Sequence, residues 1–445
     1  MTFKVEGDED QFMMEQLERD TVEKVLACIR KDELVQLVTE LVNIPSAGGR
    51  EGQVGEHILQ WLKRQELETV RQVVAENRIN AIGILRGGGG GPSLIFNGHT
   101  DTVYSGSEED APVLGVEVLK PESQPRLFTK GNRLYGEGVY NDKGNVSAFL
   151  IAGAALKKCG VKLRGDVILT SVVGEIERAP IGPYQGPLYE GGGHGTRYLL
   201  SHGITSDYAI VAESSQGEKA QFSLTWALPG AVYLKVSTFG EAKYTPRIDH
   251  GHPHAIERMA PVIEFLRRWG MDYEQARRYE FAGGVIIPKV NIGAIEGGLP
   301  YKPNYSPAVC SVYLDVRIPP GVEPQQIKTE LEDKLRAQGF AVSVGMYRSN
   351  KGYEADVERI QPLVRAVTEA REYLLGSPPD RIHPHWTNTW NDLNAFLEVG
   401  IPTIKCGASP GLEVKGDERM SMDPEDLLTA ARLYAIAALK ICGAA

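Results

Sequence analysis

The sequence predicts an α/β protein of two domains, in which the second domain is inserted into the first. Three observations support this fold class. The 445 residues exceed the size that one hydrophobic core ordinarily supports. Strands alternate with helices over residues 1–221, which is typical of a mostly parallel sheet. A different pattern follows over 222–343, and long helices return over 344–445, so the chain divides into three predicted segments.

The first segment begins with helices and continues into buried strands. Apolar residues recur at helical spacing over residues 15–45, which is enough for two helices, and again over 54–65. The segment 145–160 is predicted as a helix that ends at glycine. Apolar strands that run into polar residues lie in 84–103, 165–177 and 206–215. Because open α/β sheets bind ligands at the carboxyl ends of their strands, we expect the functional site there.

The middle segment predicts a separate α+β unit. Its alternating strands lie in 225–240, 289–298 and 308–321, and its amphipathic helices lie in 254–270 and 325–339. Helices at 359–376 and 424–442 then enclose an apolar strand at 401–407. We therefore interpret the middle segment as an insertion between two halves of one α/β domain.

Composition limits the classes of partner. The net charge of -10 and the pI near 5.5 argue against nucleic acid and anionic membranes, so we expect a small-molecule partner. No apolar run approaches the about 20 residues that span a bilayer, and the acidic N-terminus lacks the pattern of a signal peptide. These features predict a cytoplasmic protein. The five cysteines are widely spaced without a CxxC pair and are predicted as buried, reduced thiols: Cys28, Cys159, Cys310, Cys406 and Cys442.

Polar clusters at the predicted strand ends indicate a metal site. A neutral imidazole with oxygen ligands suits Zn²⁺ or Mn²⁺, and a carboxylate two residues after the histidine can support catalysis by orienting its ring. An isolated His-x-Asp pair is usually structural, but several clusters at successive strand ends favour a site. The clusters are His99 with Asp101, the segment GEGVYNDKG at 136–144, and Glu175 with Glu213.

Several motifs carry a resemblance to a known family. The segments NGHTDTV, GEGVYNDKG, VVGEIE, AIVAE, LDVR and ERMSMDPEDLLTAARLYA occur in this order between about residue 30 and the C-terminus. In these motifs the chain resembles the superfamily of zinc-dependent amidohydrolases that contains aminoacylase, acetylornithine deacetylase and glutamate carboxypeptidase. The resemblance implies a phosphorylase/hydrolase-like catalytic domain and an inserted ferredoxin-like lid or dimerisation domain. It also implies hydrolysis of a C–N bond with a glutamate as general base, in a homodimer or higher homo-oligomer.

The resemblance assigns roles to individual residues. His99, Asn141 and Glu213 occupy the positions of the first metal's ligands, although the family has aspartate where this chain has Asn141. Asp142 is the alternative oxygen ligand if the register shifts by one residue. Glu175 occupies the position of the general base.

The family's second metal ion lacks its ligands here. The glutamate expected after the base is Ile176, and the histidine expected four residues before Glu418 is Val414. Neither apolar side chain can bind a metal, and the Asn141 amide bridges two cations poorly. The sequence therefore predicts one divalent ion per chain, Mn²⁺ or Zn²⁺, which is sufficient to activate water near neutral pH.

Other positions are candidates for contact with substrate. In the inserted domain, Tyr244 occupies the position of a family histidine that reaches across a dimer, and Asn304 that of a substrate-binding asparagine. Arg317 is interpreted as structural. Three further histidines receive no assigned role: His250, His252 and His254.

Aromatic residues concentrate at 381–392, just before the last core strand. The family binds its substrate near this segment, so His385, Trp386 and Trp390 are expected to contact a flat or hydrophobic carboxylated ligand. The alternative is that both tryptophans belong to the hydrophobic core.

These observations predict a metal-dependent hydrolase of a non-peptide C–N bond in a small carboxylated substrate. The favoured reaction is hydrolytic deamination of an aromatic amino acid such as 5-nitroanthranilate, because the chain resembles the 5-nitroanthranilate aminohydrolase branch. In that reaction the aromatic ring of the substrate can absorb negative charge. One alternative is a deacylase of N-acyl amino acids. The alternative from another class is a metal-free binding protein that kept the fold.

Overall fold

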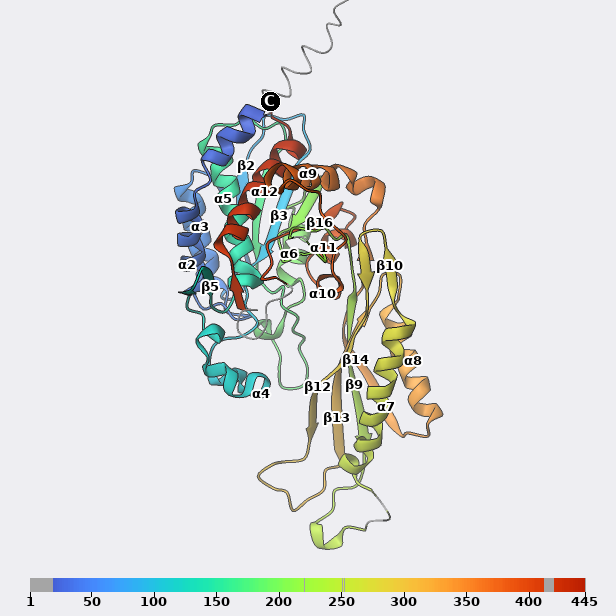
Figure 1. Ribbon diagram of the computed structural model, residues 1–445. Helices are drawn as coiled ribbons and strands as arrows, with labels where there is room; N and C mark the ends of the chain where they lie inside the picture. Colours follow the sequence, from blue (N-terminus) through green and yellow to red (C-terminus); the bar gives the residue numbers. More distant parts are fainter. Residues whose placement is uncertain (1–18, 220, 250, 252, 412–419, 445) are drawn as a thin grey trace, which may run out of the picture.

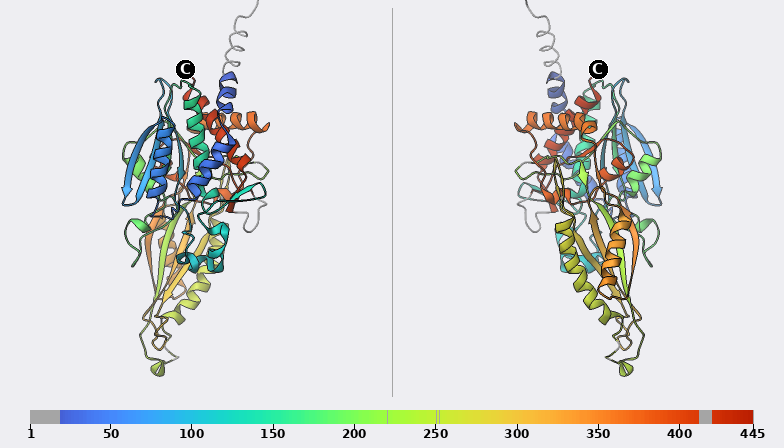
Figure 2. Two further views of the ribbon diagram at one scale, coloured as in Figure 1. Left: turned by 90° about the vertical axis from the view of Figure 1, so that its left-hand side faces the viewer. Right: turned by 90° about the vertical axis from the view of Figure 1, so that its right-hand side faces the viewer.

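The computed structural model describes residues 19–219, 221–249, 251, 253–411 and 420–444. Figure 1 shows two units along one long axis: a larger unit around a twisted sheet, and a narrower unit that extends away from it. The same elongated shape is seen in the two side views of Figure 2.

A mixed six-stranded sheet forms the centre of the larger unit. Its order is β1 (Glu68–Ala75), β2 (Arg78–Leu85), β6 (Val167–Val172), β3 (Leu94–His99), β7 (Tyr208–Val211) and β16 (Thr403–Lys405). The last four strands are parallel, and β1 and β2 are antiparallel to their neighbours. The predicted α/β class with a mostly parallel sheet is therefore confirmed.

Helices cover both faces of this sheet, because neighbouring strand residues point to opposite sides. Phe96 packs with the helices of one face and Ile95 with those of the other. The first face carries the helix over 19–27, α2 (Lys31–Val42), α3 (Gly52–Arg64), α5 (Gly144–Lys158), α9 (Val357–Leu375) and α12 (Pro424–Cys442). The second face carries α6 (His194–Ser201) and α11 (Leu393–Glu398).

The narrower unit has ferredoxin-like topology. Its elements follow in the order β9 (Gly230–Phe239), α7 (Ala255–Ala276), β12 (Val290–Gly297), β13 (Val309–Ile318), α8 (Pro324–Ala337) and β14 (Val342–Asn350). The sheet order β12-β13-β9-β14 is the antiparallel arrangement of a β-α-β-β-α-β fold. Both helices pack on one face, against alternate strand residues such as Val232 and Val312. The predicted boundary at residue 343 falls within β14.

Two short strands connect the units. The segment entering the narrower unit contains β8 (Ala227–Leu228), and the segment leaving it contains β15 (Tyr353–Glu354). These strands pair with each other, Leu228 opposite Tyr353. The Asn394 side chain accepts a hydrogen bond from the Tyr353 amide (3.2 Å) and donates one to the carbonyl oxygen of Pro229 (2.9 Å), so it fastens both connections to α11.

The remaining elements are short. A hairpin, β10 (Tyr279–Phe281) and β11 (Gly284–Ile286), projects from the narrower unit and packs against α10 (Pro384–Thr387). A small sheet comprises β4 (Phe128–Lys130), β5 (Arg133–Tyr135) and β17 (Ser421–Met422), and α4 (Ala111–Leu114) lies in the preceding loop.

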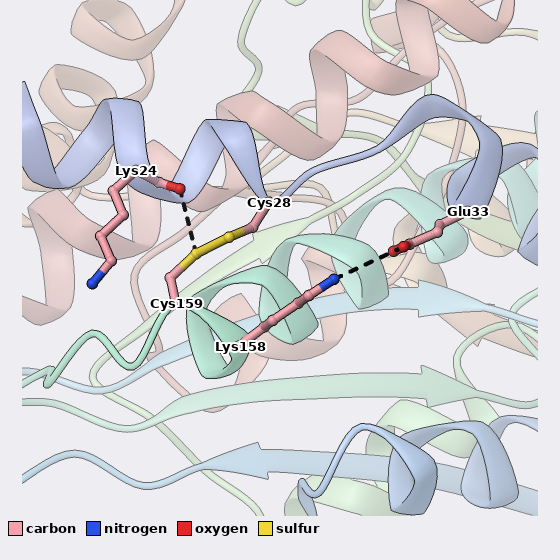
Figure 3. Close-up of a disulfide and its surroundings, with 5 residues drawn as sticks. All are labelled: Lys24, Cys28, Glu33, Lys158 and Cys159. Carbon is pink, nitrogen blue, oxygen red and sulfur yellow. Dashed lines mark hydrogen bonds and ion pairs between the residues drawn. A yellow bond between two sulfur atoms is a disulfide. The ribbon is translucent and has the colours of Figure 1, made fainter.

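The cysteines differ from the prediction at one pair. Cys28, which follows the helix over 19–27, forms a disulfide with Cys159 at the end of α5 (Figure 3). The expectation that all five cysteines are reduced is therefore wrong, because a separation of 131 residues in sequence concealed their proximity in space. Cys310, Cys406 and Cys442 are free and buried. Within the described part of the chain, no helix is long and apolar enough to cross a membrane.

Candidate metal centre and substrate pocket

The parallel strands bring three potential ligands together. His99 is the last residue of β3, Glu175 follows β6 by three residues, and Glu213 follows β7 by two. Because these strands are adjacent, their carboxyl ends meet at one edge of the sheet. One ligand atom from each of the three side chains lies within 4.8 Å of the others, which is a spacing that a single metal ion can bridge.

A hydrogen bond to the main chain of Asp101 orients the His99 ring. Its Nδ1 lies 2.9 Å from the carbonyl oxygen of Asp101, so this nitrogen carries the proton and donates. The Nε2 atom faces the cluster, 3.1 Å from Oδ1 of Asn141 and 3.6 Å from a carboxylate oxygen of Glu175, where a cation could replace its proton. The ring therefore presents a ligand nitrogen toward the cluster.

The Asp101 carboxylate positions the segment that carries Glu175. It accepts hydrogen bonds from the backbone amides of Glu175 (3.1 Å) and Ile176 (2.9 Å), and one of its oxygens lies 3.5 Å from Nδ1 of His99. Asp101 is fully buried, so these bonds are protected from water. The same side chain thus orders both the imidazole and the proposed base.

Asn141 and Asp142 both lie beside the cluster, joined by a cis peptide bond. Asn141 directs its side-chain oxygen toward His99 and lines the pocket. Asp142 is fully buried: one carboxylate oxygen accepts from Asn145 (3.2 Å), and the other has no partner among the described residues. The structure leaves either residue as the third ligand.

The charges of the cluster fit a bound cation. Burial, reinforced by the negative charge of Glu213, raises the pKa of Glu175 well above its usual range, and burial does the same for the pKa of Asp142. Glu213 accepts a hydrogen bond from Asn391 (2.9 Å) with one oxygen, and its other buried oxygen has no partner in the described chain. Concentrated negative charge and unpartnered oxygens are what a divalent ion would satisfy.

A pocket of about 850 Å³ opens in front of the cluster. Asn141, Glu175 and Glu213 form its floor, and residues of the narrower unit such as Arg317 and Lys289 contribute to its wall. The site therefore lies between the two units, where α/β enzymes commonly bind small molecules.

The aromatic segment predicted to bind substrate also lines this pocket. Trp386 and Trp390 are 7% and 5% exposed, and neither indole nitrogen has a hydrogen-bond partner among the described residues. The His385 ring packs edge-on against Trp386 at 4.7 Å. Trp386 also belongs to a small apolar cluster with Phe281 of β10. It therefore both lines the pocket, as expected for substrate contact, and packs in a hydrophobic core, as the alternative proposed.

Tyr244 and Asn304 are not in this pocket. Both residues follow strands at the end of the ferredoxin-like sheet that is farthest from β8. The ten-residue strand β9, which begins next to β8, separates them from the larger unit by roughly 30 Å. The amide of Thr245 donates to the carbonyl oxygen of Asn304, and the Tyr244 ring packs on Tyr305 at 5.5 Å. Within one chain these residues cannot contact a ligand at the metal cluster.

The structure describes only some of the remaining positions that were discussed in the sequence. Ile176 lines the pocket and has no ligand atom. His254 caps the N-terminus of α7. The positions of His250, His252, Val414 and Glu418 lie outside the described residues.

Two residues of the pocket were not predicted to line it: Arg317, which was interpreted as structural, and Lys405. Arg317 is inside the pocket wall, where it forms ion pairs with Asp315 and with Glu177 of the larger unit. Lys405, the last residue of β16, also lines the pocket although it is only 1% exposed. A lysine within the apolar run IPTIKCG was the signal that could have identified it.

Comparison with known proteins identifies the family of the chain. The model of the peptidase family M20/M25/M40 matches residues 95–440, and the chain belongs to this family. The N-formyl-4-amino-5-aminomethyl-2-methylpyrimidine deformylase of Bacillus subtilis is 27% identical over 319 residues, covering 68% of this chain and 67% of that protein. The acetylornithine deacetylase of Buchnera aphidicola is 25% identical over 272 residues, covering 61% of this chain and 62% of that protein.

A solved structure shows the same fold. An M20 family metallo-carboxypeptidase from Sulfolobus solfataricus has a TM-score of 0.66 at 15% sequence identity, covering 92% of this chain and 99% of that one. The predicted superfamily is thereby confirmed, and the chain is a metal-dependent hydrolase of the amidohydrolase type.

Proposed function

We propose that the protein hydrolyses a non-peptide C–N bond in a small carboxylated molecule, using one divalent metal ion. The observation that carries this proposal is the convergence of His99, Glu175 and Glu213, because both glutamates also line a pocket of about 850 Å³. His99 and Glu213 would hold the ion, with Asn141 as third ligand, or Asp142 in its place.

The metal ion and the residues around it would have separate roles in the reaction. When bound, Mn²⁺ or Zn²⁺ at this position lowers the pKa of water and polarises the scissile group. Glu175 accepts the proton of the attacking water and returns it to the leaving nitrogen. Asp101 keeps the Glu175 backbone in place through the two amide hydrogen bonds described above.

The proposal of a single ion depends on the residues that replace ligands. Ile176 lines the pocket where a second carboxylate would be needed, and Asn141 presents a neutral amide. Metal analysis of purified protein is expected to give about one Mn²⁺ or Zn²⁺ per chain. Two tightly bound ions would refute the single-ion site, and none would favour the metal-free binding protein.

The substrate is proposed to be an aromatic amino acid such as 5-nitroanthranilate. The buried faces and free indole nitrogens of Trp386 and Trp390 suit a flat ring that carries hydrogen-bond acceptors. The second candidate is a deacylase of N-acyl amino acids, which the deformylase and deacetylase relatives favour.

Product analysis separates these two candidates. Aromatic amino acids and N-acyl amino acids are supplied in parallel, and ammonia and free carboxylic acid are measured. Ammonia from the aromatic amine supports deamination, whereas rapid acyl cleavage without ammonia would replace it by the deacylase. In either reaction Glu175→Ala is expected to lower kcat roughly 10²- to 10⁴-fold with unchanged metal content. Near-normal turnover would show that Glu175 is not the base.

Assembly and location are proposals as well. We propose a homodimer formed through the narrower unit, whose edge strand β12 is largely exposed and includes Ile295 at 59% exposure. Light scattering on a size-exclusion column tests it. The proposed location is the cytoplasm, where a disulfide such as Cys28–Cys159 is uncommon, and non-reducing mass spectrometry of protein from intact cells tests that point.

A further inference from the structure

Lys405 is a buried cation inside the pocket. It ends β16, in register with Val211 of β7, and Glu213 follows β7 by two residues. Lys405 and Glu213 therefore lie at the same edge of the sheet, at the carboxyl ends of two adjacent parallel strands. The Lys405 side chain lines the pocket while being 1% exposed, so a buried charge faces the space that a ligand would fill.

The ammonium group keeps hydrogen-bonding capacity for a ligand. Nζ donates to the carbonyl oxygen of Trp386 (2.9 Å) and, more weakly, to Oγ1 of Thr389 (3.4 Å). An ammonium group has three donors, and no third partner is present among the described residues. The two partners lie in the segment 381–392, so Lys405 is anchored on the side of the pocket where the tryptophans lie.

The charge of Lys405 also suits a site with one metal ion. Burial lowers the pKa of Lys405, and the negative charges of Glu213, Glu175 and Asp142 oppose this by favouring the ammonium form. The ammonium group therefore adds a positive charge close to three carboxylates of the cluster. Buried lysines are rare unless a partner compensates them, and here the partners are the acids of the cluster and the anionic ligand.

We infer that Lys405 is a substrate-contacting cation of this site, whose ammonium group donates to an anionic oxygen of the bound molecule. The inference deepens the proposed function, because it explains how a single-ion site holds a carboxylated substrate beside three acids. Lys405 is bonded to the segment that carries the tryptophans and interacts with the acids of the cluster, so it would orient the charged end of the substrate. The reactive nitrogen is then left to face Glu175.

The test compares Lys405→Met with Arg371→Met. Arg371 is a matched control, because it is a buried cation that donates to main-chain oxygens of Gln221 and Pro378 but lies outside this pocket. Benzoate is the probe, and its affinity is measured by calorimetry with Mn²⁺ present. Loss of a charge-assisted hydrogen bond predicts roughly 10- to 100-fold weaker binding in Lys405→Met, and unchanged binding in Arg371→Met.

Mn²⁺ affinity gives a second readout that does not depend on turnover. Removing a positive charge beside the acids is expected to tighten Mn²⁺ binding by roughly fivefold. If Lys405→Met does not fold, Lys405→Gln takes its place, since the amide can still donate to Trp386. Unchanged benzoate affinity in a folded Lys405 variant overturns the inference. Weaker Mn²⁺ binding in that variant also overturns it, because either result would mean that Lys405 is purely structural.

The outcomes separate this inference from the proposed function. If the wild-type protein binds no Mn²⁺, the proposed metal-dependent reaction fails. The benzoate comparison, repeated on metal-free protein, still decides whether Lys405 contacts an anionic ligand.

Discussion

Glu51 and Arg78 form a buried ion pair whose charges interact with Asp101. Both side chains are fully buried, and the guanidinium group donates to the two carboxylate oxygens at 2.7 and 3.0 Å. Its remaining donors reach the carbonyl oxygens of Pro187 (2.7 Å) and Glu190 (2.6 Å). The pair therefore joins the N-terminus of α3 to the loop that precedes α6.

Replacing Arg78 by Met leaves the Glu51 carboxylate buried without its partner. Breaking a buried pair in this way costs about 3–5 kcal/mol of unfolding free energy, because the desolvation of the remaining charge is no longer offset. In the double variant Glu51→Met/Arg78→Met neither charge is desolvated, and only the two carbonyl bonds are lost. We expect it to be more stable than the Arg78→Met variant.

Urea unfolding of metal-free protein, followed by tryptophan fluorescence, measures all four members of this double-mutant cycle. Metal-free protein is used because bound Mn²⁺ would add its own stabilisation. A double variant whose loss equals the sum of the two single losses would show that the charges are uncoupled, and would refute the reasoning.

Three further perturbations test other parts of the structure. Burial raises the pKa of Glu137 from its ordinary 4.5 to about 7, so the wild-type protein loses about 3 kcal/mol of unfolding free energy as pH rises from about 4.5 to about 7. Glu137→Gln cannot ionise, so in urea unfolding it should be more stable than wild type by about 3 kcal/mol at pH 8 and equally stable at pH 4. Cys28→Ser opens a link across 131 residues and should lower the unfolding free energy by about 3–5 kcal/mol, with reducing agent lowering the melting temperature of wild type only. Asp101→Asn replaces an acceptor of two backbone amides by a group that can donate, so Mn²⁺ affinity should fall roughly 10- to 100-fold in calorimetry; unchanged affinity would contradict its positioning role.

The sequence predicts the cluster of His99, Glu175 and Glu213 because strand order matters little for it. Polar residues after several parallel strands meet at one sheet edge whichever strands are neighbours. A separate α+β unit was likewise predictable over 222–343, since three of its strands alternate and its helices are amphipathic. Its ferredoxin-like topology was implied by the family resemblance alone, and β14 was not predicted as a strand.

The missed features depend on contacts between distant segments. Lys405 stands out in sequence as a lysine within an apolar strand, but its position beside Glu213 follows only once β16 is placed next to β7. The pairing of Cys28 with Cys159 requires the helix over 19–27 to lie against the end of α5. Spacing along the chain contains neither fact, and the resemblance to relatives did not supply them.

The pairing of β8 with β15 has a mechanical consequence. The ferredoxin-like unit is inserted by two connections, yet these form one hydrogen-bonded ribbon fastened by Asn394. The two units are also joined by the β10–β11 hairpin against α10, by the ion pair of Arg317 with Glu177, and by hydrogen bonds from Arg348 to the main-chain oxygens of Gly191 and Gly192. Because Arg317 and Glu177 pair across the two units and both line the pocket, bending of the β8–β15 ribbon would change the shape of the pocket wall.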